Sequence, residues 1–171
     1  MTQATIPHST ESFVADSQHA YRLQDQSLAL PVQRAVLGIQ HLADSGSIEH
    51  ELRELMKIRA SQINGCAYCL AMHWRDALTA GERIDRLSTL TAWREADWFT
   101  PRERAALAWT EALTNLPAHG ITDALYSACR EVFSEQEMVD LSVNIVAINS
   151  WNRLAVGFSA RPEAFARNGA Q

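Results

Sequence analysis

Residues 54–73 read ELMKIRASQINGCAYCLAMH and contain a C-x-x-C pair, Cys66 and Cys69, with His73 four residues further on. An α-helix turns by about 100° per residue, so these three positions fall on one narrow helix face. The preceding Asn64-Gly65 breaks a helix and puts Cys66 at or near a helix N-terminus. There the helix dipole and unpaired N–H groups favour a thiolate. The stretch therefore predicts a redox-active thiol pair with an imidazole base.

A carboxylate is expected beside that imidazole. The segment before the C-x-x-C pair, IEHELRELMKIRASQ, is typical of a helix that can return Glu54 towards His73. A carboxylate next to an imidazole fixes its tautomer and raises its basicity. Glu54 could instead pair with Lys57 or Arg53 at the surface. Tyr68, between the two thiols, is either an aromatic filler or a proton-handling group.

The spacing of these residues resembles the signature of a known family. Glu54, eleven further residues, Cys66-x-x-Cys69, three residues and His73 are similar to the motif of the AhpD-like alkylhydroperoxidases, within the carboxymuconolactone decarboxylase superfamily. The stretch 149–153, NSWNR, is similar to the closing helix of these proteins. The resemblance implies an all-α, single-domain helical bundle and a thiol-dependent hydroperoxide reductase.

The resemblance also implies roles for the site residues. Cys69 attacks the peroxide, Cys66 resolves the resulting sulfenic acid as a disulfide, and an external dithiol of protein or lipoyl type restores both thiols. His73 acts as general base and Glu54 orients it. His73 is nearer in sequence to Cys69, and Cys66 is expected to be exposed to the reductant. The best-known family members have a histidine where this chain has Tyr68, so a proton relay there is not carried over.

Composition narrows the class of protein. The chain has 171 residues, 47% of them hydrophobic, and a net charge of −5, which is typical of one globular domain over residues 1–171. The first 25 residues are expected to be loosely held. An acidic chain without basic runs argues against nucleic acid as a partner. No secretory signal, membrane span or disulfide framework is evident, which predicts a cytoplasmic protein.

Apolar periodicity and capping residues predict helices throughout and no convincing strand. Thr100-Pro101-Arg102-Glu103 and Ser134-Glu-Gln-Glu137 are capping boxes, and Ser47 is a candidate cap for the helix that carries Glu54. A short helix is expected around residues 11–22. The longer helices are expected at 31–44, 48–63, 66–80, 82–96, 101–116, 123–132 and 135–158.

Several alternatives stay open at this point. Glu54, Cys66, Cys69 and His73 could bind zinc, but no second Cys/His pair occurs at ligand spacing, so neither a metal nor another cofactor is expected. Cys129 is predicted to be a packed, inert thiol. The protein could be a dithiol–disulfide oxidoreductase, a lactone decarboxylase (which works without a cysteine pair) or an oligomeric binding protein. A homo-oligomer, trimer or hexamer, is expected from the apolar content and the resemblance.

Overall fold

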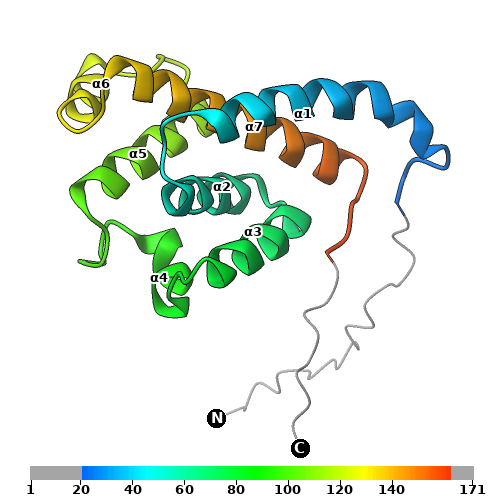
Figure 1. Cartoon of the computed structure of the whole chain (residues 1–171), viewed down its shortest axis with the longest axis horizontal. Helices are drawn as coiled ribbons and strands as arrows, with labels where there is room; N and C mark the ends of the chain where they lie inside the picture. Colours follow the sequence, from blue (N-terminus) through cyan, green and yellow to red (C-terminus); the bar gives the residue numbers. More distant parts are fainter. Residues whose placement is uncertain (1–20, 163–171) are drawn as a thin grey trace, which may run out of the picture.

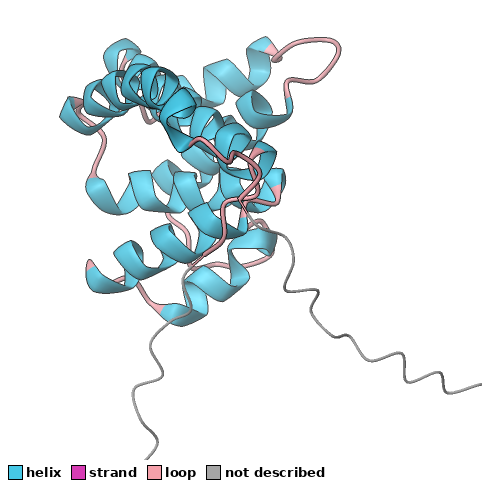
Figure 2. Ribbon diagram, turned by 90° about the vertical axis from the view of Figure 1, so that its right-hand side faces the viewer, coloured by secondary structure: helices cyan, strands magenta, loops and turns pink. Residues whose placement is uncertain are grey.

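The computed structural model describes residues 21–162, and within that range every regular element is helical (Figures 1 and 2). The all-α prediction is confirmed. The helix expected at 11–22 and most of the loosely held segment 1–25 lie outside the described residues. The elements are η1 (Gln26–Ala29), α1 (Leu30–Ser45), α2 (His50–Asn64), α3 (Ala67–Thr79), α4 (Ile84–Thr89), η2 (Leu90–Ala92), α5 (Pro101–Asn115), α6 (Asp123–Arg130) and α7 (Glu135–Gly157).

Helix α2 is the centre of the packing. It contacts α3, α5 and α7, while α1 runs antiparallel along α7 at the top of Figure 1. One apolar cluster joins α2 to α5, α6 and α7 around Met56, Trp109 and Leu141. A second joins it to α3, α4 and α5 around Ile58 and Leu87. Because apolar neighbours lie on both sides, α2 buries polar residues as well: its buried set is Leu52, Glu54, Leu55, Met56, Lys57, Ile58, Ala60 and Ser61.

The helix expected over 82–96 is shorter than predicted. α4 ends at Thr89, and the chain then passes through the 3-10 turn η2. Arg104 on α5 donates hydrogen bonds to the backbone carbonyls of Trp93, Arg94 and Ala96, in the turns that follow η2. The Trp93 indole N–H donates to Glu111 at 2.9 Å. Contacts with α5 therefore hold the residues that the local pattern placed in the last turn of the expected helix.

The predicted cap of α2 is also wrong. Glu49, not Ser47, is the N-cap residue, and its side chain makes no capping hydrogen bond. The backbone N–H and hydroxyl of Ser47 both donate to the Asp140 carboxylate on α7, at 2.8 and 2.7 Å. Ser47 thus ties the α1–α2 connection to α7 instead of starting α2.

No helix within residues 21–162 combines the length and the apolar character needed to cross a membrane. The longest, α7, starts at a capping box: Ser134 Oγ accepts from the Glu137 backbone N–H at 3.2 Å, and the Glu137 carboxylate accepts from the Ser134 N–H at 2.7 Å. Both predicted capping boxes are present, the other at Thr100.

The cap of α7 gives a stability prediction. We expect Ser134→Ala to lower the free energy of unfolding by about 1 kcal/mol, because it leaves an N–H at the helix start without its acceptor. Ser150→Ala is the matched control, since it removes an exposed hydroxyl from the same helix that bonds only the Val146 carbonyl. Urea unfolding of both variants measures the difference, and equal losses would contradict the capping role.

Candidate active site

The thiol pair lies at the corner between α2 and α3. α2 ends at Asn64, and its C-cap residue, Gly65, has a φ of 65°, in the left-handed region that glycine adopts without steric cost. The next residue, Cys66, is the N-cap of α3, and its Sγ accepts a hydrogen bond from the Cys69 backbone N–H at 3.4 Å. The predicted position of Cys66 at a helix N-terminus is therefore confirmed.

The two sulfur atoms are in direct contact. The Sγ atoms of Cys66 and Cys69 are 2.6 Å apart, and both residues are free thiols. The hydrogen bond that Cys69 donates lowers the pKa of Cys66 to about 7, although burial opposes this shift. The same hydrogen bond, together with burial, raises the pKa of Cys69. Cys66 is therefore the thiol of the pair that ionises first.

The expected exposure of Cys66 is wrong. Both cysteines are 1% exposed, because the corner packs against α7 in a cluster with Ala60 and Ile148. A reductant cannot contact Cys66 from the surface of this conformation. Cys129 is also buried, as predicted, and burial raises its pKa.

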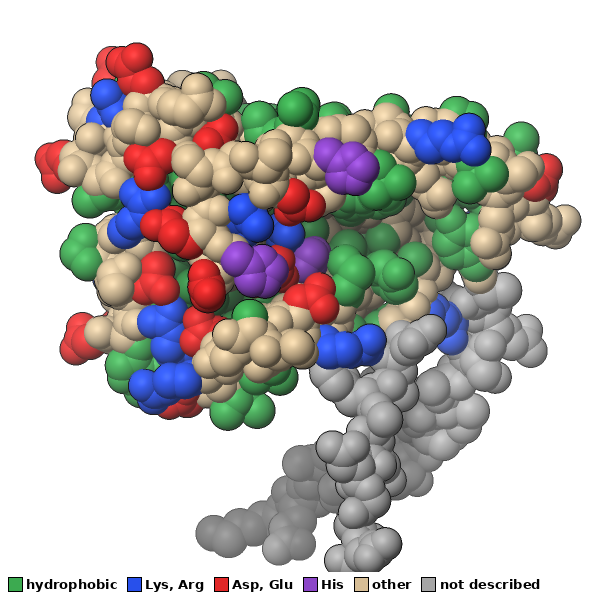
Figure 3. Space-filling model, in the orientation of Figure 1, with side chains coloured by type: hydrophobic (Ala, Val, Ile, Leu, Met, Phe, Trp, Pro, Cys, Tyr) green, Lys and Arg blue, Asp and Glu red, His purple; other side chains and the backbone are tan. Residues whose placement is uncertain are grey.

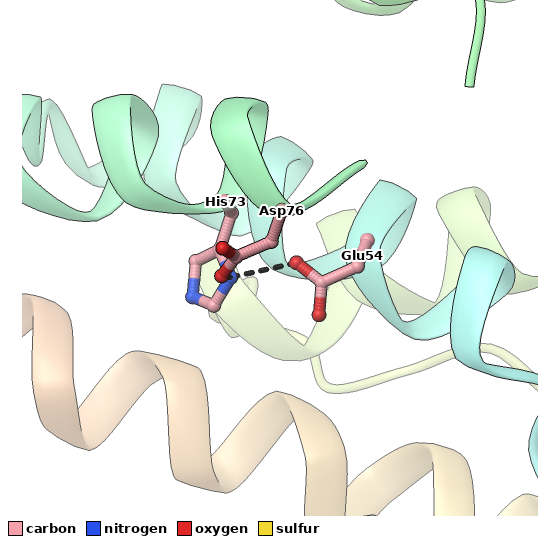
Figure 4. A group of neighbouring side chains, drawn as sticks. All are labelled: Glu54, His73 and Asp76. Carbon is pink, nitrogen blue, oxygen red and sulfur yellow. Dashed lines mark hydrogen bonds and ion pairs between the residues drawn. The ribbon is translucent and has the colours of Figure 1, made fainter. Parts of the chain in front are cut away.

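The imidazole and the carboxylate meet as the sequence predicts. His73 Nδ1 lies 2.7 Å from Glu54 Oε2, and both side chains are buried (Figure 4). Because an ionised carboxylate only accepts hydrogen bonds, Nδ1 carries the proton and donates it to Glu54. The second ring nitrogen of His73 points away from Glu54 in Figure 4. That nitrogen is left to act as an acceptor or base.

Glu54 has a second partner, Lys57, whose Nζ donates to Oε1 at 2.9 Å. Burial would raise the pKa of Glu54, but the hydrogen bond and charge of His73, together with those of Lys57, lower it to about 2. Glu54 is consequently an ionised carboxylate in the interior. The surface pairing with Lys57 considered from the sequence is replaced by a buried pairing with Lys57 and His73 at once.

A cavity of about 920 Å³ opens beside these residues. Cys69 and His73 both line it, with Tyr68 and Met72 from the same helix, whereas Cys66 does not. α1 and α7 supply the opposite walls, and Figure 3 shows hydrophobic side chains gathered in the hollow below α1. The remaining lining residues are Tyr21, Gln26, Gln33, Leu37, Gln40, Asp44, Trp151, Leu154, Ala155, Ala160 and Arg161. Tyr68 is partly exposed at this cavity, which fits either of its two predicted roles.

The residues that could bind a metal ion in the structure differ from the four that the sequence suggested as zinc ligands. In the described part of the chain, the group whose candidate ligand atoms lie within 4.8 Å of one another is Glu54, His73 and Asp76, and it includes neither thiol of the pair. The Lys57 ammonium already neutralises Glu54 there. A cation would compete with that ammonium for the same carboxylate, so the arrangement suits an acid–base pair better than a metal centre.

Sequence reasoning missed a set of amides next to the thiols. Asn152 on α7 is buried, and hydrogen bonding from its side chain acts to lower the pKa of both Cys66 and Cys69. It also bonds Asn64 and Ser61 of α2, at 2.9 and 3.0 Å. Asn152 falls within the stretch 149–153, but the sequence gives no indication that this residue faces the cysteines.

Comparison with known proteins identifies the family of the chain. The sequence model of the carboxymuconolactone decarboxylase family matches residues 31–112. YdfG of Bacillus subtilis, an uncharacterized protein, is 39% identical over 140 residues, covering 82% of this chain and 95% of YdfG. The chain therefore belongs to the AhpD-like proteins of the carboxymuconolactone decarboxylase superfamily.

Solved structures show the same architecture. A protein of unknown function from Agrobacterium tumefaciens, ATU0492, a candidate AhpD antioxidant defence protein, superposes with a TM-score of 0.81 at 34% identity. The match covers 85% of this chain and 100% of that one. An uncharacterized peroxidase-related protein with an alkylhydroperoxidase AhpD core, from Ralstonia eutropha, gives a TM-score of 0.69 at 24% identity over 80% of this chain and 74% of its own. The second similarity shows the fold alone.

The lowered pKa of Glu54 predicts how stability depends on pH. A carboxylate whose pKa is lower in the folded state stabilises the fold above its unfolded pKa and loses that contribution as the pH falls through its folded pKa. We expect the unfolding free energy of the wild type to fall between about pH 4.5 and about pH 2, and Glu54→Gln to show a flatter profile there. Urea unfolding across this range measures it. Glu51→Gln, which removes an exposed carboxylate from α2, is the control, and an equal flattening in it would refute the assignment.

Proposed function

We propose that this protein is a thiol-dependent hydroperoxide reductase that acts on organic hydroperoxides. The observation that carries the proposal is that Cys69 and His73 line one cavity while Cys66 touches Cys69 without lining it. A peroxide in the cavity would contact the Cys69 sulfur and the His73 imidazole, and the Cys66 sulfur lies in contact with that of Cys69. This is the arrangement that a peroxidatic thiol, its base and its resolving thiol require.

In the first step the Cys69 sulfur attacks the terminal peroxide oxygen. The S–O bond forms as the O–O bond breaks, which oxidises the sulfur to a sulfenic acid and releases an alkoxide. The Cys69 thiol gives up its hydrogen bond to Cys66 and transfers its proton to the free ring nitrogen of His73, and the resulting imidazolium returns that proton to the alkoxide, giving the alcohol. The Glu54 carboxylate stabilises that imidazolium through the 2.7 Å hydrogen bond.

In the second step the Cys66 thiolate attacks the Cys69 sulfenic acid. The S–S bond forms and hydroxide leaves, becoming water with one further proton. The N-cap position of Cys66 favours this step, because the backbone N–H of Cys69 lies 3.4 Å from the Cys66 sulfur and stabilises a thiolate there. An external dithiol then reduces the disulfide and is itself oxidised to a disulfide, which closes the cycle.

The position of the cavity supports a slender dithiol as reductant. Both sulfurs are buried, and only Cys69 of the pair reaches the cavity. A flat protein surface cannot contact either atom in this conformation, whereas a lipoyl-type dithiol on a flexible arm can enter a space of about 920 Å³. A small disulfide that enters the cavity would also meet Cys69, so a dithiol–disulfide oxidoreductase is the second candidate.

A homo-oligomer, trimer or hexamer, is part of the proposal. Large apolar side chains are exposed along α1 and the turn before it, and such surface commonly marks a subunit contact. They are Leu28, Leu30, Val32, Leu37 and Leu42.

Trapping the sulfenic acid tests the proposed roles of the two thiols. We expect Cys66→Ser, treated with one equivalent of an organic hydroperoxide, to retain a sulfenic acid on Cys69, because the resolving thiol is missing. A dimedone-type probe and mass spectrometry identify the labelled residue. Cys69→Ser should show no fast peroxide consumption and no label on Cys66.

Cys129→Ser is the control for this experiment, since Cys129 is buried away from the pair and should react as the wild type does. A labelled Cys66 in Cys69→Ser, formed at an undiminished rate, would reverse the roles. Slow peroxide consumption by the wild type combined with fast reduction of a small disulfide would instead favour the oxidoreductase.

A further inference from the structure

The proposed mechanism leaves one buried polar group beside the sulfurs without a role. Asn152 lies on α7 and is 1% exposed. It lies one turn along α7 from Ile148, which packs against both cysteines, and its amide is 3.0 Å from the hydroxyl of Ser61, the residue whose carbonyl accepts the Cys66 N–H. Hydrogen bonding from the Asn152 side chain acts to lower the pKa of both thiols. An amide can present either its oxygen or its N–H₂ group to a sulfur, and only the N–H₂ group stabilises a thiolate. The orientation of the Asn152 amide therefore decides what it does.

That orientation is set by a chain of hydrogen bonds that starts at Asn149. Arg153 Nη1 lies 2.7 Å from Asn149 Oδ1, and arginine can only donate, so this atom of Asn149 is the oxygen. Asn149 Nδ2 lies 2.9 Å from the Ile145 carbonyl oxygen, which can only accept. One partner can only donate and the other can only accept, so both require the same orientation of the Asn149 amide.

The orientation of the Asn149 amide fixes that of Asn64, which in turn fixes that of Asn152. Asn64 Nδ2 lies 2.9 Å from Asn149 Oδ1 and 2.9 Å from Asn152 Oδ1, so it donates to both oxygens. The N–H₂ group of Asn152 is then on the other side of its amide. One of its hydrogens goes to Ser61 Oγ at 3.0 Å. The second hydrogen is left for the sulfur pair.

From this geometry we propose that Asn152 is a thiolate-stabilising residue, which donates its second N–H to the Cys66–Cys69 pair, and that Asn64 is the positioning residue that keeps it turned that way. Burial disfavours a negative sulfur, and a fixed N–H donor offsets that cost without bringing in water. Asn152 would stabilise the Cys66 thiolate before it resolves the sulfenic acid, and again when it leaves as the disulfide is reduced. The inference deepens the proposed peroxidase function.

A spectroscopic titration of the thiols tests this role without any peroxide. The ultraviolet absorbance of the thiolate is followed against pH in a Cys129→Ser background kept reduced by a phosphine. Asn152→Leu should raise the midpoint of the pair by about one pH unit, which leaves about tenfold less thiolate below that midpoint. Asn152→Asp keeps the shape of the side chain, removes the N–H donor and adds a negative charge when ionised, so its midpoint should lie above that of Asn152→Leu.

Asn144→Leu is the matched control. Asn144 is also on α7 and 1% exposed, but its amide bonds the Ala43 and Asp140 carbonyls and not the thiols. Its midpoint should equal that of the parent. The other charged and titratable groups around the pair are the same in every variant: Glu54 and Lys57 on α2, His73 on α3 and Arg153 on α7.

Two results would overturn the proposal. One is an unchanged midpoint in Asn152→Asp, which retains the native shape and so reports even where Asn152→Leu does not fold. The other is an equal shift in Asn144→Leu, which would make the effect a general consequence of altering α7. The titration uses no peroxide, so it is independent of the peroxidase assay. If the midpoints shift as expected but the protein does not reduce peroxides, the proposed function is wrong and the role of Asn152 still holds.

Discussion

A buried, ionised carboxylate is the constraint on which the rest of the structure depends. Glu54 is 2% exposed and keeps its charge only because His73 and Lys57 bond its two oxygens. An unpaired charge in that place would cost several kcal/mol. The requirement fixes how α2 and α3 sit against each other, and it holds His73 beside the cavity in a single tautomer. Fold stability and acid–base chemistry therefore rest on the same hydrogen bonds.

The corner at Gly65 and Cys66 separates two properties that a redox pair needs. Cys66, as the N-cap of α3, has the lower pKa, while Cys69, one turn on, has access to the cavity. In the proposed reaction the accessible sulfur meets the peroxide with help from His73, and the readily ionised sulfur resolves and later leaves. Because the two sulfurs are in direct contact, the two thiols titrate as one coupled pair.

The sequence predicted the parts of this site that depend on local spacing. The N-cap position of Cys66, the pairing of Glu54 with His73 and the capping boxes all follow from residues within a few turns of one another, and the structure confirms them. It could not predict features set by other helices. Packing against α7 buries Cys66 and brings Asn152 to the end of α2, where it bonds Ser61 and Asn64. Such contacts join residues that are distant in sequence, and no local pattern encodes them.

The most direct test of the central claim is a double-mutant cycle on Glu54 and His73. The rate of Cys69 oxidation by an organic hydroperoxide is compared in the wild type, Glu54→Gln, His73→Gln and the double variant. If the buried pair works as one unit, each single change slows the reaction strongly and the double change costs little more than either. Fully additive losses, or a wild-type rate in either single variant, would show that the pair only holds the fold.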